Sequence, residues 1–135
     1  MSDNFTDFLL ARTVDPEFDG RFNSVIQLNF KQRLRIVLQE LEDLTGYRTL
    51  ITSGYSTAGH VEGSKHYKGL AVDFVLLSEK NGKWVEKYPK PEMRAQMKFL
   101  CEKYKCLLLD EYKTPSNKAS GPHFHLQYEG GTLGV

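Results

Sequence analysis

The sequence has almost no excess of charge of either sign, with 18 lysines and arginines against 17 aspartates and glutamates. Binding to nucleic acid or to an anionic membrane surface depends on clustered basic residues, so neither partner is expected. No apolar run approaches the roughly 18 residues of a membrane-spanning helix. The first residues carry neither a basic segment nor an apolar one, so we expect synthesis in the cytoplasm without a secretory signal peptide.

Cysteine is also scarce, because only Cys101 and Cys106 occur. Their spacing is neither that of a CxxC redox motif nor a usual zinc-binding spacing. A reducing cytoplasm argues against a disulfide between them. We therefore predict two buried thiols near the end of a helix.

What is present suits a globular protein. The 135 residues are enough to bury a core without disulfides, and 40% hydrophobic with 26% charged residues is ordinary for a soluble chain. We predict a single domain over residues 1–135, acting as a monomer. Residues 1–28 have weak periodicity and several turn formers, so we interpret them as an irregular lead-in, with a short helix near residues 5–10.

Hydrophobic periodicity divides the rest of the chain into helices and strands. Apolar residues recur at three and four between Phe30 and Leu44, which predicts an amphipathic helix that Gly46 ends. The pair Asn81-Gly82 predicts a hairpin turn. The other expected elements are strands at 47–52, 70–77, 83–85, 107–109 and 123–128, and a helix that begins at Pro91. This order predicts an α+β domain with a small antiparallel sheet packed on helices.

The four histidines all lie outside the predicted helices. Two of them, His123 and His125, belong to a strictly alternating strand, in which successive side chains point to opposite faces. His123, His125 and Gln127 should therefore share one face, and the apolar residues between them should face the core. Two imidazoles on one face indicate a surface that receives a polar group.

Asp73 lies inside the apolar strand 70–77, where an unpaired carboxylate would be costly to bury. It needs a cation, several hydrogen-bond donors or a metal ion. His66 can reach the same point if the chain turns at Gly69. Two histidines, one aspartate and a water molecule form a good open zinc site. The alternative is that Asp73 caps a loop and the histidines are surface residues.

Five residues with fixed spacing carry a resemblance to a known family: Ser64, His66, Gly69, Ala71 and Asp73. They match the pattern SxHxxGxAxD, which HxH follows here as His123-Phe124-His125. The pattern resembles that of the zinc D-Ala-D-Ala carboxypeptidases and L-Ala-D-Glu endopeptidases, often grouped with penicillin-insensitive murein endopeptidases and the hedgehog signalling domain. The resemblance extends from about residue 45 to residue 128 and implies a hedgehog/D-Ala-D-Ala-peptidase-like fold.

The resemblance implies one zinc ion per chain, with His66, Asp73 and His125 as ligands. His123 would then lie beside the metal and stabilise the oxyanion. In other members the histidine that aligns with His123 is the ligand, and Gly121-Pro122-His123-Phe124 partly resembles their sequence. We favour His125.

The general base is where this sequence departs from the family. Members with an ExxH motif carry an acid three residues before the ligand, and here Pro122 stands there, or Ser120 if His123 is the ligand. Hedgehog-like members place a glutamate at the end of the preceding strand. That position makes Glu111 the candidate, with Asp110 second. Neighbours on a strand face opposite ways, so at most one should point at the metal. The alternative is that both are solvated turn residues.

Substrate binding also differs from the family pattern. Many relatives follow Ser-Gly-Tyr with an arginine that grips a substrate carboxylate, and this sequence has Ser56 there. His60, Lys65 and Arg48 are alternative partners for that group. We assign Ser64, His60 and Ser56 to substrate binding. Trp84 and Tyr88 are expected to pack in the core, with a place in a substrate groove as the alternative.

The resulting hypothesis is a zinc metallopeptidase that hydrolyses peptidoglycan stem peptides, as an endopeptidase or a D,D- or L,D-carboxypeptidase. The missing arginine favours an endopeptidase. The architecture is analogous to that of a phage-type endolysin, which degrades the cell wall after release from the cytoplasm. The alternatives are a zinc-binding module that binds a peptide or partner without hydrolysis, and a metal-free structural protein.

Overall fold

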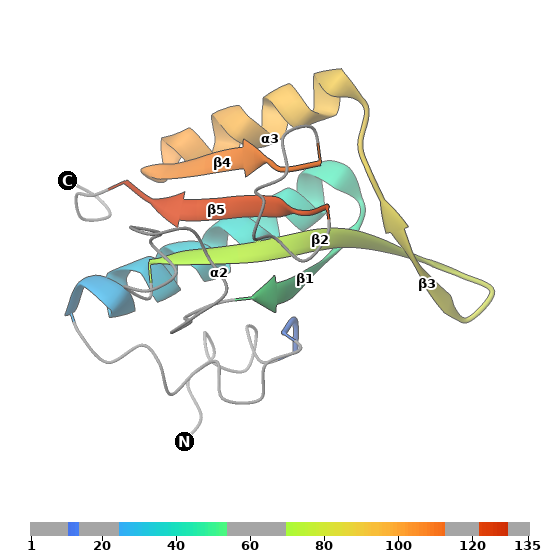
Figure 1. Cartoon of the computed structure of the whole chain (residues 1–135), viewed down its shortest axis with the longest axis horizontal. Coiled ribbons are helices and arrows are strands. Elements are labelled where there is room, and N and C mark those ends of the chain that lie inside the picture. Colours follow the sequence, from blue (N-terminus) through green and yellow to red (C-terminus); the bar gives the residue numbers. More distant parts are fainter. Residues whose placement is uncertain (1–10, 14–24, 54–69, 113–121, 130–135) are drawn as a thin grey trace.

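The computed structural model describes residues 11–13, 25–53, 70–112 and 122–129. Their helices and strands follow the order α2 (Val25–Thr45), β1 (Arg48–Ser53), β2 (Ala71–Lys80), β3 (Lys83–Lys87), α3 (Pro91–Lys103), β4 (Cys106–Asp110) and β5 (Phe124–Tyr128). All paired strands are antiparallel, and both helices pack on the sheet (Figure 1). The predicted α+β class, with a small antiparallel sheet packed on helices, is therefore confirmed.

The strand order of the sheet is β1-β2-β5-β4, with β3 also paired to β2. The last described strand, β5, thus lies between β2 and β4 (Figure 1). The pairing of β2 with β5 covers the segment of β2 that contains Asp73. The topology therefore brings two segments that are about fifty residues apart in sequence side by side, as antiparallel pairing allows.

The core lies between the helices and one face of the sheet. Helix α2 contributes an apolar stripe in which Phe30, Leu34, Val37, Leu38 and Leu41 are fully buried. The sheet contributes Val72, Phe74, Leu76, Phe124 and Leu126 to the same cluster. Strand alternation then puts Asp73 and His125 on the face that is turned away from the helices.

Helix α2 begins at Val25, so the predicted irregular lead-in is wrong for residues 25–28. The side chain of Leu28 is 42% exposed. The exposed side chain of Leu28 lies off the buried stripe that Phe30 begins, so the predicted helix was started too late. At the other end, the N–H of Gly46 donates to the carbonyl of Glu42 at 2.9 Å, and Gly46 has a φ of 75°. The predicted glycine stop is thus confirmed.

Part of the lead-in is ordered against the sheet. Thr13 forms a parallel bridge with Ile51, and the guanidinium of Arg12 binds the carboxylate of Glu42 through two hydrogen bonds of 2.8 and 2.9 Å. Burial alone would raise the pKa of Glu42, but the hydrogen bonds from Arg12 and Thr49 lower it below its ordinary value. The predicted helix near residues 5–10 lies outside the described residues.

The predicted hairpin turn and the predicted buried cysteines are both confirmed. Asn81 and Gly82 have φ values of 54° and 78°, as a two-residue hairpin turn requires. Cys101 and Cys106 are free and buried, as predicted, and burial raises the pKa of the Cys101 thiol.

The predicted core packing of Trp84 is wrong, because its side chain is 55% exposed on β3. Strand β3 projects beyond α2 and α3, so neither of these helices covers it (Figure 1).

Tyr88 is also more exposed than a core residue, at 42%. Its ring nevertheless lies 4.6 Å from that of Tyr112, measured between centroids, and therefore packs at the rim of the molecule. None of the described helices is long and apolar enough to cross a membrane.

Candidate metal centre

Asp73 and His125 face each other directly across the β2–β5 ladder. They are register partners, and residues in that position on neighbouring strands project to the same face. The Nδ1 atom of His125 lies 3.1 Å from Oδ1 of Asp73. Strand β1 deviates from regular pairing at the same level, with a shift of register between Ile51 and Ser53, which pairs with Asp73. The sheet itself thus holds the two predicted ligands together.

His123 joins this pair from just before β5. Its Nε2 atom lies 3.3 Å from Oδ1 of Asp73, so that one carboxylate oxygen is shared by two imidazoles. The side chains of Asp73 and His123 are each only 8% exposed, and that of His125 is 9% exposed. The cluster is therefore shielded from water, and the interactions within it are stronger than at the surface.

Glu111 closes the other side of the cluster. Its backbone N–H donates to the carbonyl of His123 at 3.1 Å, which continues the β4–β5 ladder one residue beyond the end of β4. Its Oε2 lies 3.3 Å from Nε2 of His123, and its Oε1 lies 3.9 Å from Nδ1 of His125. The site thus contains two carboxylates and two imidazoles within contact distance of one another.

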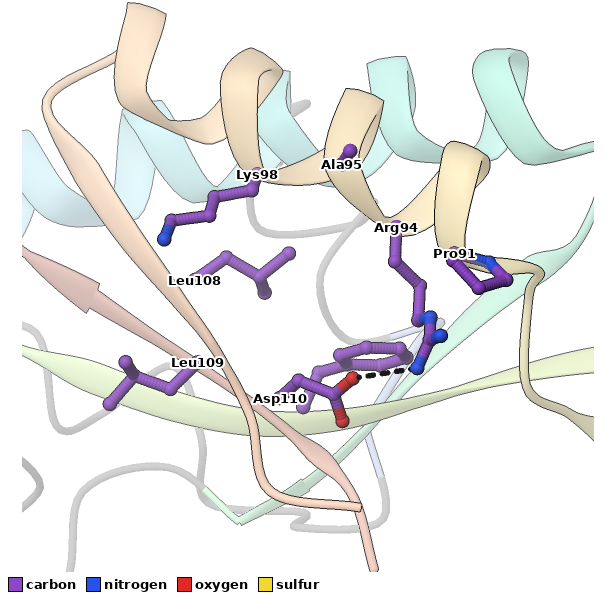
Figure 2. Close-up of a pocket in the computed structure, with 8 residues that line it drawn as sticks. Pro91, Arg94, Ala95, Lys98, Leu108, Leu109 and Asp110 are labelled. Carbon is purple, nitrogen blue, oxygen red and sulfur yellow. Dashed lines mark hydrogen bonds and ion pairs between the residues drawn. The ribbon is translucent and has the colours of Figure 1, made fainter. Parts of the chain in front are cut away.

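Asp110, the second candidate base, is engaged elsewhere. Its Oδ2 accepts a hydrogen bond of 2.6 Å from the hydroxyl of Tyr88 and forms an ion pair of 3.2 Å with Arg94. Its Oδ1 accepts the backbone N–H of Tyr112 at 3.1 Å. Figure 2 shows Arg94 reaching from α3 to this carboxylate at the edge of a pocket of about 300 Å³ between α3 and β4. The side chain of Asp110 therefore lies on the helix side of the sheet, where it contacts Arg94, and that of Glu111 faces the histidines.

The protonation of His125 follows from these neighbours. Burial by itself lowers the pKa of His125, but hydrogen bonds with Asp73 and Gln127 and the negative charges of Asp73 and Glu111 outweigh it. The pKa is therefore raised above its ordinary value. In chemical terms, the two carboxylates attract a positive charge to the Nδ1 side of the ring. A proton or a metal ion can supply that charge.

The structure brings together four of the predicted site residues: Asp73, His123, His125 and Glu111. The third predicted ligand, His66, and the predicted substrate residues Ser64, His60 and Ser56 lie outside the described residues, as does Lys65. Among the residues that the structure describes, no group of three or more His, Cys, Asp or Glu side chains is arranged to hold a metal ion. The described part of the site supplies two of the three predicted ligands.

Arg48, one alternative for a substrate carboxylate, is remote from the cluster. It pairs with Leu77, whereas Asp73 pairs with Ser53 at the other end of β1. Four steps along a strand correspond to about 13 Å. Its guanidinium donates to the carbonyl of Ala11 at 3.0 Å, so Arg48 helps to hold the segment before α2.

Two residues that touch the site were given no role from the sequence, Gln127 and Glu129. The amide of Gln127 contacts His125, and Glu129 contacts that amide. The signal that could have found them is the continued alternation of polar residues along His123, His125, Gln127 and Glu129.

No protein-family model matches this chain, and no curated protein matches it. The interpretation of the cluster therefore depends on its residues and their geometry.

Proposed function

We propose that this protein is a zinc-dependent peptidase that hydrolyses peptidoglycan stem peptides, with a hedgehog/D-Ala-D-Ala-peptidase-like fold. The observation that carries the proposal is the pairing of Asp73 with His125 in register, with His123 and Glu111 closing on them in a buried cluster. The sequence pattern alone indicates these same residues.

The distances suit a zinc ion. Two ligand atoms that each lie about 2.0–2.1 Å from a tetrahedral zinc are roughly 3.3–3.4 Å from each other. His125 Nδ1 and Asp73 Oδ1 are 3.1 Å apart, so the pair needs little movement to bind a metal between them. His66 would complete the ligand set from the segment that precedes β2.

The third ligand is better assigned to His125 than to His123. Distance alone does not decide, because His123 Nε2 also lies 3.3 Å from Asp73. Metal-binding histidines usually donate their second ring N–H to an acceptor, and His125 has such an acceptor in Gln127 at 2.8 Å. His123 instead places Nε2 against both Asp73 and Glu111, which suits a hydrogen-bond donor beside the metal.

Zinc in this site would lower the pKa of a bound water towards neutrality and polarise the scissile carbonyl. Glu111 would accept the proton of the attacking water, a role that is supported by its carboxylate lying beside both histidines and being 18% exposed. Nε2 of His123 would donate a hydrogen bond to the carbonyl oxygen as negative charge develops there. The contact of 3.3 Å between Oε2 of Glu111 and Nε2 of His123 would hold both groups in position before substrate arrives.

The class of peptide bond follows from what the site lacks. Ser56 stands where relatives carry a carboxylate-binding arginine, and Arg48 is committed to Ala11. We therefore propose an endopeptidase in preference to a carboxypeptidase. Peptidoglycan as substrate, and a phage-type endolysin as the setting, are supported by the motif resemblance only.

The test is a release assay on purified peptidoglycan. Zinc-loaded protein should liberate free amino groups, a chelator should abolish the release, and added zinc should restore it. Stoichiometric zinc without any cleavage would instead indicate a non-hydrolytic zinc-binding module. Absence of zinc binding at neutral pH would overturn the proposal altogether and leave a structural protein.

A further inference from the structure

A chain of hydrogen bonds leads from the candidate metal centre along the face of β5 that is turned away from the helices. Nε2 of His125 lies 2.8 Å from Oε1 of Gln127, and Nε2 of Gln127 donates to Oε1 of Glu129 at 2.7 Å. The three residues occupy alternate positions, so their side chains lie in a row on one side of the strand. The row begins in the buried cluster and ends at an exposed carboxylate.

Glu129, at the outer end of the row, determines which group donates in each of its hydrogen bonds. An ionised Glu129 only accepts hydrogen bonds, so the NH₂ group of Gln127 must face it. The carbonyl oxygen of Gln127 must then face His125. An amide oxygen cannot donate, so Nε2 of His125 carries the hydrogen and Nδ1 presents a lone pair towards Asp73 in the neutral ring.

We propose that Gln127 is a positioning residue that selects the tautomer of His125 for binding zinc through Nδ1, and that Glu129 fixes the orientation of the Gln127 amide. This inference rests on the proposed function, because it requires a metal at Asp73 and His125. The opposite tautomer would place a proton on Nδ1, between the two ligand atoms that lie 3.1 Å apart. Zinc would have to displace that proton, and the ring would have to change its tautomer, before binding.

A neutral acceptor suits this position. The cluster already contains the carboxylates of Asp73 and Glu111, both within 4 Å of His125. Gln127 orients the ring without adding a third charge next to it, and the charge of Glu129 acts one residue farther out. Partners of this kind, which hydrogen-bond a ligand and do not bind the metal, typically contribute 10–100-fold to metal affinity.

The test compares zinc affinity in three variants, measured by competition with a chelator of known affinity at pH 7.5. Gln127→Met removes the acceptor at similar size and should weaken zinc binding by about tenfold or more. Gln127→Glu keeps an acceptor towards His125 and should restore affinity to within a few-fold of the unmodified protein. Gln96→Met makes the same chemical change on the exposed face of α3 and should leave affinity unchanged.

Glu129→Gln provides a further variant that does not disturb the buried cluster, since Glu129 is exposed. The amide introduced by this change can donate as well as accept, so it no longer forces one orientation on Gln127, and zinc should bind a few-fold more weakly. The tautomer itself is visible in the nitrogen-15 spectrum of the metal-free protein. At a pH above the pKa of His125, the neutral ring should carry its hydrogen at Nε2 in the unmodified protein. In Gln127→Met the hydrogen should exchange between Nε2 and Nδ1.

The outcomes separate the two proposals. If folded Gln127→Met binds zinc as tightly as the unmodified protein, with an unchanged tautomer, the role of Gln127 is overturned. The peptidase proposal then stays intact. Weakened zinc in Gln127→Met, without cleavage of peptidoglycan by the unmodified protein, supports Gln127 and overturns the peptidase. An unmodified protein that binds no zinc overturns both.

Discussion

Asp110 and Glu111 are neighbours in the chain, yet their carboxylates belong to two polar clusters of opposite character. The cluster around Asp110 is balanced, because Arg94 supplies a positive charge and Tyr88 and the N–H of Tyr112 supply hydrogen bonds. The cluster around Glu111 contains a second carboxylate, Asp73, and two imidazoles.

The difference indicates what each cluster is for. A carboxylate such as that of Asp110, with a permanent cation and several hydrogen-bond donors, stabilises local structure and has little left to offer a ligand. The buried carboxylate of Asp73 and the partly buried one of Glu111 face a pair of histidines, so they attract a cation, whether a proton or a metal ion. The contrast thus separates a structural acid from a functional one at adjacent positions, and it can be tested by changing each acid in turn.

The largest effect is expected from Asp73→Ala. This change removes the oxygen that both imidazoles share, so bound zinc should fall from one ion per chain to background and hydrolysis should be lost with it. Metal analysis of the purified protein after dialysis measures the effect. Asp110→Ala is the matched control and should retain stoichiometric zinc. Retention of zinc by Asp73→Ala would show that the cluster is not the metal site.

The next largest effect is expected from Glu111→Gln. The amide keeps the size of the side chain but cannot accept a proton, so kcat should fall by about 10²–10⁴-fold. Zinc content should stay at one ion per chain, because Glu111 is not a predicted ligand. The comparison with Asp110→Asn is direct, since that variant should keep most of the activity. If Asp110→Asn were the inactive one, the assignment of the two acids would be reversed.

A pH effect follows from the raised pKa of His125 in the metal-free protein. A group whose pKa is higher in the folded state stabilises the fold below its unfolded pKa, and this contribution is lost as the pH rises through the folded value. The unfolded value is the ordinary 6.5, so the metal-free protein should lose stability as the pH rises above about 6.5.

Thermal unfolding between pH 5.5 and 8.5 measures this change. Saturating zinc should reverse its direction, because zinc binds the deprotonated ring and adds stability as the pH rises. In His125→Asn the loss of stability on raising the pH should be smaller. An unchanged profile in that variant would mean that another group titrates.

A smaller effect on stability is expected from Asp110→Asn. The amide leaves Arg94 without its counter-charge in a site where the arginine side chain is only 13% exposed. The expected loss is about 1–3 kcal/mol, as for a buried hydrogen-bonding group deprived of its partner. Chemical denaturation measures it. If Glu111→Gln lowered the free energy of unfolding by as much, both acids would stabilise the fold and the distinction between the two clusters would be wrong.

The smallest effect is expected from Trp84→Ser, which lies outside both clusters. The side chain is 55% exposed on a hairpin that projects from the sheet, so stability should change by less than about 0.5 kcal/mol. Zinc affinity should not change. A rise in KM with kcat unchanged would indicate that Trp84 contacts the substrate.

The elements with a strong period were predicted well from the sequence. Alternation from His123 to Tyr128 placed the histidines on one face and Phe124, Leu126 and Tyr128 in the core, where they are found. Asn81-Gly82 fixed the hairpin, since both positions need a positive φ. The start of α2 was placed too late because the buried stripe was counted from Phe30, and the exposed Leu28 lies off that stripe. The exposure of Trp84 was missed because an aromatic residue on a strand does not reveal whether a second layer covers it.

The site was predictable in its composition and not in its arrangement. The motif indicated Asp73 and the histidine pair, and alternation indicated that only one of Asp110 and Glu111 could face them. Which one does so depends on Tyr88 and Arg94, which are 22 and 16 residues away from Asp110 in sequence. The position of β5 between β2 and β4 likewise depends on packing between distant segments, which local patterns do not encode.

The position of β5 also has a consequence for the order of events during synthesis. Until the ribosome has made residues 124–128, β2 and β4 cannot be joined through their common neighbour, and each keeps an open edge. Asp73 then has no His125 opposite it, so the nascent chain cannot form the two-ligand pair. Metal uptake should therefore follow completion of the sheet, and a chain stopped after β4 should be both unable to bind zinc and prone to aggregate.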